Sequence, residues 1–151
     1  MFLSKSCLYG IRSVLYLAIE NKRNYISIRE IAEELDIPFH YLTKILQRLN
    51  HKGIVKSVKG PQGGVTFNKA PEKISLYDLI TAIDGQEIFT RCLIADVKCS
   101  SKNPCVFHRL IYDPRKMLQK DLYRKNVKQA AAGVLKADLK FYNHKLFKVS
   151  N

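Results

Sequence analysis

The chain has 151 residues and carries 26 lysines and arginines against 13 acidic residues, which gives a formal net charge of +13. This length fits one domain, or a small domain with an extension, and the charge favours a polyanionic partner such as nucleic acid. The apolar run at residues 14–19 is too short to span a membrane and its flanks do not resemble a signal peptide, so we expect a cytoplasmic protein with reduced thiols.

Hydrophobic periodicity and breakers predict a helix–turn–helix in the first third of the chain. Apolar residues at helical spacing predict an amphipathic helix over about residues 4–21, and Ser27 followed by Glu30 forms a capping box that begins a second helix. Pro38 separates this helix from a third one, which has an apolar inner face and ends near Gly53. The outer face of the third helix is polar and basic, as in a recognition helix that enters the major groove, and carries His40, Lys44, Gln47, Arg48 and His51.

A short β-hairpin is predicted to follow the third helix. Residues 54–58 and 65–67 are rich in β-branched or aromatic residues, and a glycine-rich turn at residues 59–64 joins them. This arrangement is typical of the wing of a winged helix, in which glycines let the tip approach the DNA backbone and Lys59 reaches phosphates or a narrow minor groove. Taken alone, such a hairpin usually indicates only a turn. After a helix–turn–helix it is a strong signal.

The predicted recognition helix and wing lie in a stretch without acidic residues. Residues 37–71 contain no aspartate or glutamate, whereas basic residues recur throughout, at Lys44, Arg48, Lys52, Lys56, Lys59 and Lys69. A surface that approaches phosphates is expected to exclude acids in this way. The alternative is a solvated basic face that binds nothing, and the winged-helix pattern favours nucleic acid.

The second half of the chain is predicted to be helical around one irregular segment. Ser75 and Asp78 form the cap of a fourth helix that ends near Gly85. A segment without helical period follows, and the chain becomes helical again from Val106, with Asp113-Pro114 as a kink or a fresh helix start. The sequence beyond about residue 136 is basic and contains tyrosine and phenylalanine.

The irregular segment holds three of the four cysteines, Cys92, Cys99 and Cys105, and His108 follows the last of them by three positions. Thiolates and imidazole are ligands of iron–sulfur clusters and of structural zinc, and spacing alone does not separate these two. A metal-free thiol sensor, with thiolates near Lys98 and Lys102, is the third possibility. The fourth cysteine, Cys7, is predicted to be a small buried hydrophobe. Neither a catalytic set nor a nucleotide-binding motif is readable, so we predict that the protein is not an enzyme.

These residues resemble the Rrf2-type family of bacterial transcription regulators over roughly residues 1–125. The resemblance is carried by Leu3-Ser-Lys, Tyr9-Gly-Ile-Arg, Ile31-Ala-Glu-Glu-Leu, Tyr41-Leu, Ile45-Leu-Gln-Arg-Leu, the stretch from Gly53 to Gly64, and the three-cysteine segment. Members of that family are homodimeric winged-helix proteins whose long C-terminal helices cross the dimer. Several hold an iron–sulfur cluster on three cysteines, and the state of the cluster decides which promoters they bind.

The resemblance implies roles for particular residues of this chain. The implied DNA-binding set is Ser27, His40, Tyr41, Lys44, Arg48, Lys56, Lys59, Gly60, Gln62, Gly63 and Gly64. The implied metal ligands are Cys92, Cys99, Cys105 and His108, on a 2Fe–2S cluster in preference to 4Fe–4S, with zinc or no metal as alternatives. In the nitric-oxide-sensing branch an acidic residue of the first helix is the fourth ligand; Leu8 stands there in this chain, so that ligand set is not reproduced. Six residues separate Cys92 from Cys99, one more than in the best-known cluster-binding members.

We therefore predict a mainly α-helical fold with a small β-hairpin wing, divided into three parts. Residues 1–85 form a winged helix–turn–helix DNA-binding domain, residues 86–109 a cysteine-rich sensor loop, and residues 110–151 a dimerisation helix with a basic tail. The predicted function is a homodimeric transcriptional regulator that binds a palindromic operator in double-stranded DNA, controlled by an iron–sulfur cluster that senses redox, iron–sulfur or nitric oxide status. The alternatives are a metal-free repressor controlled by thiol oxidation or a protein partner, and a zinc- or thiol-dependent enzyme.

Overall fold

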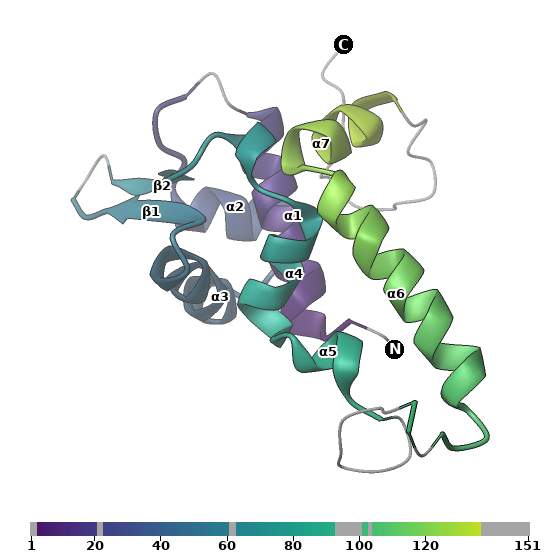
Figure 1. Ribbon diagram of the computed structural model, residues 1–151. Helices are drawn as coiled ribbons and strands as arrows, with labels where there is room; N and C mark the ends of the chain where they lie inside the picture. Colours follow the sequence, from purple (N-terminus) through teal and green to yellow (C-terminus); the bar gives the residue numbers. More distant parts are fainter. Residues whose placement is uncertain (1–2, 21–22, 61–62, 93–100, 103, 137–151) are drawn as a thin grey trace.

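The computed structural model describes residues 3–20, 23–60, 63–92, 101–102 and 104–136. It confirms the mainly α-helical fold with a two-stranded hairpin (Figure 1). In chain order the elements are α1 (Lys5–Ile19), α2 (Ile28–Leu35), α3 (Phe39–His51), β1 (Val55–Val58), β2 (Gly64–Phe67), the 3₁₀ turn η1 (Pro71–Lys73), α4 (Leu76–Asp84), α5 (Glu87–Thr90), α6 (His108–Arg124) and α7 (Val127–Lys136).

The helix–turn–helix is built on α1, against which α2 and α3 pack. The inner face of α3 is fully buried, as its apolar spacing predicts, through Leu42, Ile45, Leu46 and Leu49. The Ser27 hydroxyl caps α2 by accepting a hydrogen bond from the Glu30 amide at 3.1 Å. Only this half of the predicted capping box forms, because the Glu30 carboxylate accepts hydrogen bonds from Arg23 and Tyr16 instead.

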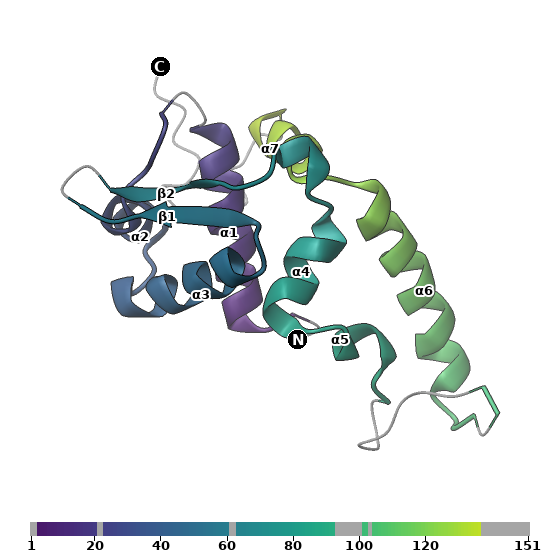
Figure 2. The same cartoon turned by 60° about the vertical axis from the view of Figure 1, so that its left-hand side comes forward.

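The hairpin forms the predicted wing and projects from one side of the helical body, away from α6 (Figure 2). Its strands pair antiparallel, with Val55 opposite Phe67 and Val58 opposite Gly64. Ile26, just before α2, pairs with the middle of β2 through mutual backbone hydrogen bonds with Val65. A Cβ on Gly64 would lie 2.4 Å from the Ile26 carbonyl oxygen, so glycine is required there by internal packing.

The fourth helix forms as predicted, and a short helix that we did not predict follows it. Ser75 and Asp78 make a reciprocal capping box at the start of α4, and Gly85, with φ +80°, ends it. The next residues form α5, which places Phe89 in the core immediately before the cysteine segment. Within the described residues no helix is long and apolar enough to cross a membrane.

Of the two outcomes predicted at Asp113-Pro114, a kink or a fresh helix start, the fresh start does not form. Helix α6 continues through Pro114, and the break falls at Lys125 and Asn126. Asn126 and Gln129 cap α7 reciprocally, with each side chain accepting from the other residue's backbone N–H at 2.9 and 3.1 Å. The chain then returns to the body, where α7 packs on α1 and buries Val127 and Ala131, whereas α6 runs beside α4 and α5 on the side away from the wing (Figures 1 and 2).

Candidate nucleic-acid interface and sensor segment

The outer face of α3 is exposed and carries no acidic side chain. His40, Lys44, Gln47, Arg48 and His51 are all exposed, and they lie opposite the buried face that anchors the helix to α1. Residues 37–71, which include α3 and the wing, lack carboxylates, so this stretch itself adds no like charge against a phosphate backbone; the nearest preceding carboxylate is that of exposed Asp36 at the end of α2. The first requirement of the predicted interface, an accessible basic face, is therefore met.

Three residues of the predicted DNA-binding set have side chains that make hydrogen bonds within the domain, and the first is Ser27, whose hydroxyl caps α2. The Tyr41 hydroxyl lies 2.6 Å from the Ser6 hydroxyl, and its ring packs edge-on against Tyr9 on α1. Nη1 of Arg48 donates to the Ile83 carbonyl at the end of α4, at 3.4 Å. These contacts tie the recognition helix to α1 and α4. Direct contacts of Tyr41 and Arg48 with DNA stay predictions.

The wing presents its lysines outward. Lys56 and Lys59 are exposed, and Gly60 adopts φ +119° at the start of the turn, a conformation that favours glycine. A Cβ on Gly63 would lie 2.2 Å from the Val58 carbonyl oxygen, so this glycine, like Gly64, is needed for close packing inside the wing. Gln62, also in the predicted set, lies outside the described residues.

Arg29 and Phe39, which the sequence patterns did not single out, also lie on this face. Both residues are exposed, and the guanidinium carbon of Arg29 lies 5.5 Å from the centre of the Phe39 ring. The sequence carries no separate signal for Phe39, because it stands three residues before Leu42 and seven before Leu46, at the spacing of the buried face of α3. The pairing with Arg29 depends on how α2 and α3 pack together and has no local sequence signature.

The described part of the cysteine segment places one predicted ligand at each end. Cys92 is half-buried and comes two residues after α5. Cys105 is half-buried one turn before α6, and its carbonyl accepts from the His108 amide at 2.9 Å. His108 begins α6, is only 7% exposed, and stacks on Tyr112 with ring centres 4.7 Å apart. Cys99 lies outside the described residues.

The donor chemistry of this segment fits a metal or a cluster. Thiol and imidazole are the side chains that hold zinc and iron–sulfur clusters, and Cys105 and His108 belong to one turn of chain. Within the described residues, no three cysteine, histidine, aspartate or glutamate side chains are gathered closely enough to hold a metal ion. The described residues therefore do not form the complete predicted ligand set, because Cys99 lies outside them.

The remaining cysteine, Cys7, is a buried residue, as predicted. It is fully buried on α1, and burial, together with the nearby Asp84 carboxylate, raises the pKa of its thiol to about 12. Asp84 in turn accepts hydrogen bonds from the backbone amide and the hydroxyl of Ser4. A thiol that stays protonated at neutral pH is a poor nucleophile and a poor metal ligand, so Cys7 lacks the chemistry expected of the other three cysteines.

The two ends of the cysteine segment are held by contacts among α4, α5 and α6, which are together called the frame below. Nη1 of Arg115, on α6, donates to the carbonyl of Arg91, the residue just before Cys92. The ring of Tyr77, on α4, stacks between Phe89 of α5 and Tyr123 of α6, with centres 5.2 and 3.9 Å away. Helices α4, α5 and α6 therefore hold the start of the segment against the helix that follows it.

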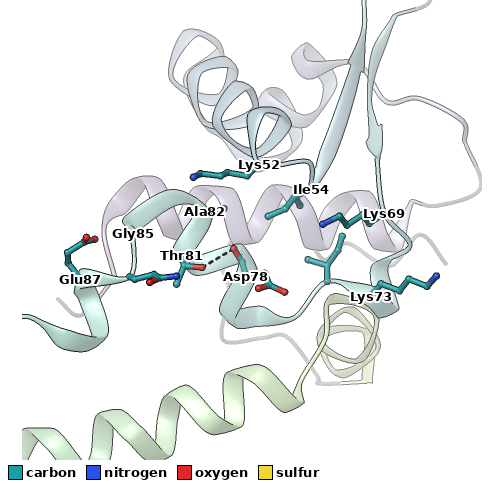
Figure 3. A pocket seen from close by; sticks show the side chains of 11 residues that line it. Lys52, Ile54, Lys69, Lys73, Asp78, Thr81, Ala82, Gly85 and Glu87 are labelled. Atoms are coloured by element: carbon teal, nitrogen blue, oxygen red, sulfur yellow. Dashed lines mark hydrogen bonds between the residues drawn. The ribbon is translucent and has the colours of Figure 1, made fainter.

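A separate cavity of about 440 Å³ lies between the end of α3, η1, α4 and the start of α5 (Figure 3). None of the predicted site residues lines it. Lys52, Lys69 and Lys73 approach it, but so do the carboxylates of Asp78 and Glu87 and the C-terminal ends of α3 and α4, which carry partial negative charge. Its charges are therefore mixed and favour neither an anion nor a cation.

Comparison with known proteins places these features in a family. The Rrf2 family, described as iron-dependent transcriptional regulators, matches residues 3–133. A putative HTH-type transcriptional regulator of Aquifex aeolicus is 36% identical over 110 residues, covering 72% of this chain and 76% of its own. The HTH-type transcriptional regulator IscR of Yersinia pseudotuberculosis is 31% identical over 70% of this chain and 63% of its own. The structure of CymR, the global cysteine regulator of B. subtilis, matches with a TM-score of 0.72 at 23% identity, over 87% of this chain and 96% of that one, which shows a shared fold.

Proposed function

The chain belongs to the Rrf2 family and is a DNA-binding transcriptional regulator rather than an enzyme, and we propose that it reads operator DNA with α3 and the β1–β2 wing. The observation that carries this proposal is the exposed, acid-free face formed by these elements, on which His40, Lys44, Lys56 and Lys59 stand. The inner face of α3 is fixed in the core, so its outer face is left for the major groove.

Salt dependence tests this face without knowledge of the operator. Lys44→Ala and Lys59→Ala should each weaken binding to a random-sequence duplex and lower the slope of log K against log salt by about 0.9 for each DNA-reading head that is bound, because each head loses one phosphate contact. The measurement is fluorescence anisotropy over a series of KCl concentrations. Lys128→Ala, on the exposed side of α7, is the control and should keep the native slope. Native slopes in both interface variants would show that DNA binds elsewhere.

We propose that Cys92, Cys99 and Cys105, with His108 as the fourth ligand, hold an iron–sulfur cluster, with 2Fe–2S favoured. The iron-dependent description of the family, the likeness to IscR and the donor chemistry of the segment support this proposal. When bound, such a cluster supplies electron transfer and sensitivity to oxidants and nitric oxide. The protein's own part is to hold His108 buried against Tyr112 and to hold Arg91 against α6 through Arg115.

A route from this segment to the DNA-reading face exists in the described contacts. The segment leaves from α5 and returns at α6, both of which stack on Tyr77 of α4. The end of α4 accepts a hydrogen bond from Arg48 of α3. We propose that ligand binding at the cysteines favours one arrangement of this frame, and with it one placement of α3, by shifting the population between two states.

The experiment that tests the cluster is a visible absorption spectrum, with iron, sulfide and zinc analysis, of protein purified without oxygen. Brown protein that contains iron and sulfide is the expected result. Colourless protein that contains zinc would make the segment a structural metal site. Colourless protein without metal would refute both metal proposals, and none of these outcomes depends on finding the operator.

The second candidate is a metal-free repressor of the same fold. It is favoured by the shared fold with CymR, which is described as the global cysteine regulator of B. subtilis. It predicts that operator affinity changes when the thiols are oxidised or when a protein partner is added, with no change on iron loading.

We further propose that the regulator is a homodimer joined through α6, which would let two DNA-reading heads engage the two halves of a palindromic operator. The outer face of α6 supports this proposal, because Leu110 and Met117 lie seven residues apart on it and are 67% and 68% exposed. We retain the three-part division into residues 1–85, 86–109 and 110–151 as part of the proposal. The packing of α7 on α1 adds a second connection between the last part and the first.

A further inference from the structure

An aromatic and cationic cluster lies at the N-terminal end of the recognition helix. Arg29, in the first turn of α2, holds its guanidinium 5.5 Å from the centre of the Phe39 ring. The ring of His40 packs edge-on against the same ring, with centres 5.5 Å apart and an interplanar angle of 72°. Phe39 and His40 are the first two residues of α3. These three side chains are called the Arg29 cluster below.

The stability of the fold does not account for the Arg29 cluster. Phe39 is 39% exposed, whereas the core side of α3 is formed by other residues. A positive charge in the first turn of a helix is opposed by the helix dipole. Among the described residues the ion pairs are those of Arg23 with Glu20 and Glu30, so Arg29 has no acidic partner there. An exposed cation held over an exposed ring, beside an acid-free face, is suited to a partner outside the chain.

The position of the cluster favours a base edge over a phosphate. In helix–turn–helix proteins the N-terminal residues of the recognition helix contact base edges, and that is where Phe39 places the guanidinium. Arginine recognises guanine by donating to O6 and N7 together, and phenylalanine suits the methyl group of thymine. Because the ring already restrains the guanidinium, less side-chain freedom is lost on binding.

We propose that Arg29 is a specificity-determining residue that recognises a guanine in each operator half-site, with Phe39 as its positioning residue. This inference rests on the proposed DNA-reading face. Phe39 also covers the methyl group of a neighbouring thymine. The two roles together make the Arg29 cluster a reader of sequence, in contrast to Lys44 and Lys59, which are proposed to contact phosphates and to carry no sequence information.

Selection from a pool of randomised DNA duplexes tests this role. The full chain, purified without oxygen, is used as wild type and as R29A, R29K and F39L, in both iron-loaded and iron-free forms. Wild type should select a guanine at one position of each half-site. R29A should lose that preference by on the order of tenfold while keeping the others, because a bidentate contact is removed. R29K keeps the charge but loses the planar guanidinium, so it should also lose the preference for guanine. F39L should weaken the guanine preference at the same position.

The slope of log K against log salt concentration distinguishes a base contact of Arg29 from a phosphate contact. Because Arg29 and Phe39 are exposed, the variants should unfold at the wild-type temperature, and Lys128→Ala should select the wild-type motif. If R29A keeps every base preference and binds all sequences more weakly with a lower salt slope, Arg29 is a phosphate contact and the inference is wrong. An R29A motif and affinity identical to wild type would also overturn it. If wild type selects no motif in either form, the proposed function fails, and this inference fails with it.

Discussion

Replacing Cys92 with alanine should abolish incorporation of iron and sulfide while leaving the thermal unfolding of the iron-free protein nearly unchanged. Cys92 is half-buried beyond the end of α5, so loss of its sulfur removes little packing. A cluster on three cysteines and a histidine, by contrast, loses one of its four protein ligands. The measurements are iron and sulfide per chain after anaerobic reconstitution, and a melting curve of the iron-free form.

Cys7→Ala is the matched control, because it removes the same sulfur from a fully buried site. It should keep full iron content but lower the free energy of unfolding by about 1–2 kcal/mol through the cavity it leaves. The pKa of the Cys7 thiol is about 12, against 9.0 for an ordinary thiol. Above pH 9 the unfolded chain therefore loses a proton that the folded chain retains, so wild-type stability should fall with rising pH more steeply than that of Cys7→Ala. Iron retained by Cys92→Ala, or lost by Cys7→Ala, would contradict the proposed ligand set.

The parts of the fold that follow local rules could be predicted from the sequence. Ser75 and Asp78 lie three residues apart and form the full capping box. Ser27 and Glu30 have the same spacing, but Arg23 and Tyr16 take up the Glu30 carboxylate, and these contacts cross a loop that local spacing does not describe. Local patterns therefore predicted the start of α2 but not the partner of its acidic residue.

The break between α6 and α7 follows one of two competing signals in the sequence, a proline and an N-cap pattern. Pro114 suggested an interruption, yet α6 continues through it. The true break carries its own signal, Asn126 followed three residues later by Gln129, which is an N-cap pattern. The break is also held by backbone pairing, since Leu76 donates to the Lys125 carbonyl and Val127 to that of Ile74. Pairing between residues so far apart in the chain leaves no mark on the hydrophobic periodicity of the sequence, so it could not be predicted from that pattern.

The candidate site was predictable to the extent that it depends on composition. The missing acids between residues 37 and 71 predicted a basic face, and its lysines are exposed. The inward contacts of Tyr41 and Arg48 were not predictable, because they depend on the packing of α3 against α1 and α4. The same holds for Arg29 and Phe39, which belong to two different helices.

Two aspartates on the outer face of α6 should dissociate the proposed dimer. In the double variant Leu110→Asp and Met117→Asp, each subunit places two carboxylates in the proposed dimer interface, where two exposed apolar side chains of α6 stood before. By two-fold symmetry every substitution acts twice. The dimer therefore contains four substituted sites, two in each subunit. If each loses about 1 kcal/mol of burial energy, the dimer is weakened by about 4 kcal/mol, which raises its dissociation constant roughly a thousandfold. Sedimentation equilibrium measures this constant directly.

The same variant connects dimerisation to DNA binding. A monomer engages one half-site, so affinity for a two-half-site operator should fall by on the order of a hundredfold or more, whereas affinity for a single half-site should stay near that of wild type. Lys128→Glu changes the charge of the chain by the same amount on exposed α7 and should leave both constants unchanged. A double variant that remains dimeric would place the interface away from Leu110 and Met117. A monomeric variant with full operator affinity would instead show that one DNA-reading head is sufficient, and the palindromic operator would then have to be abandoned.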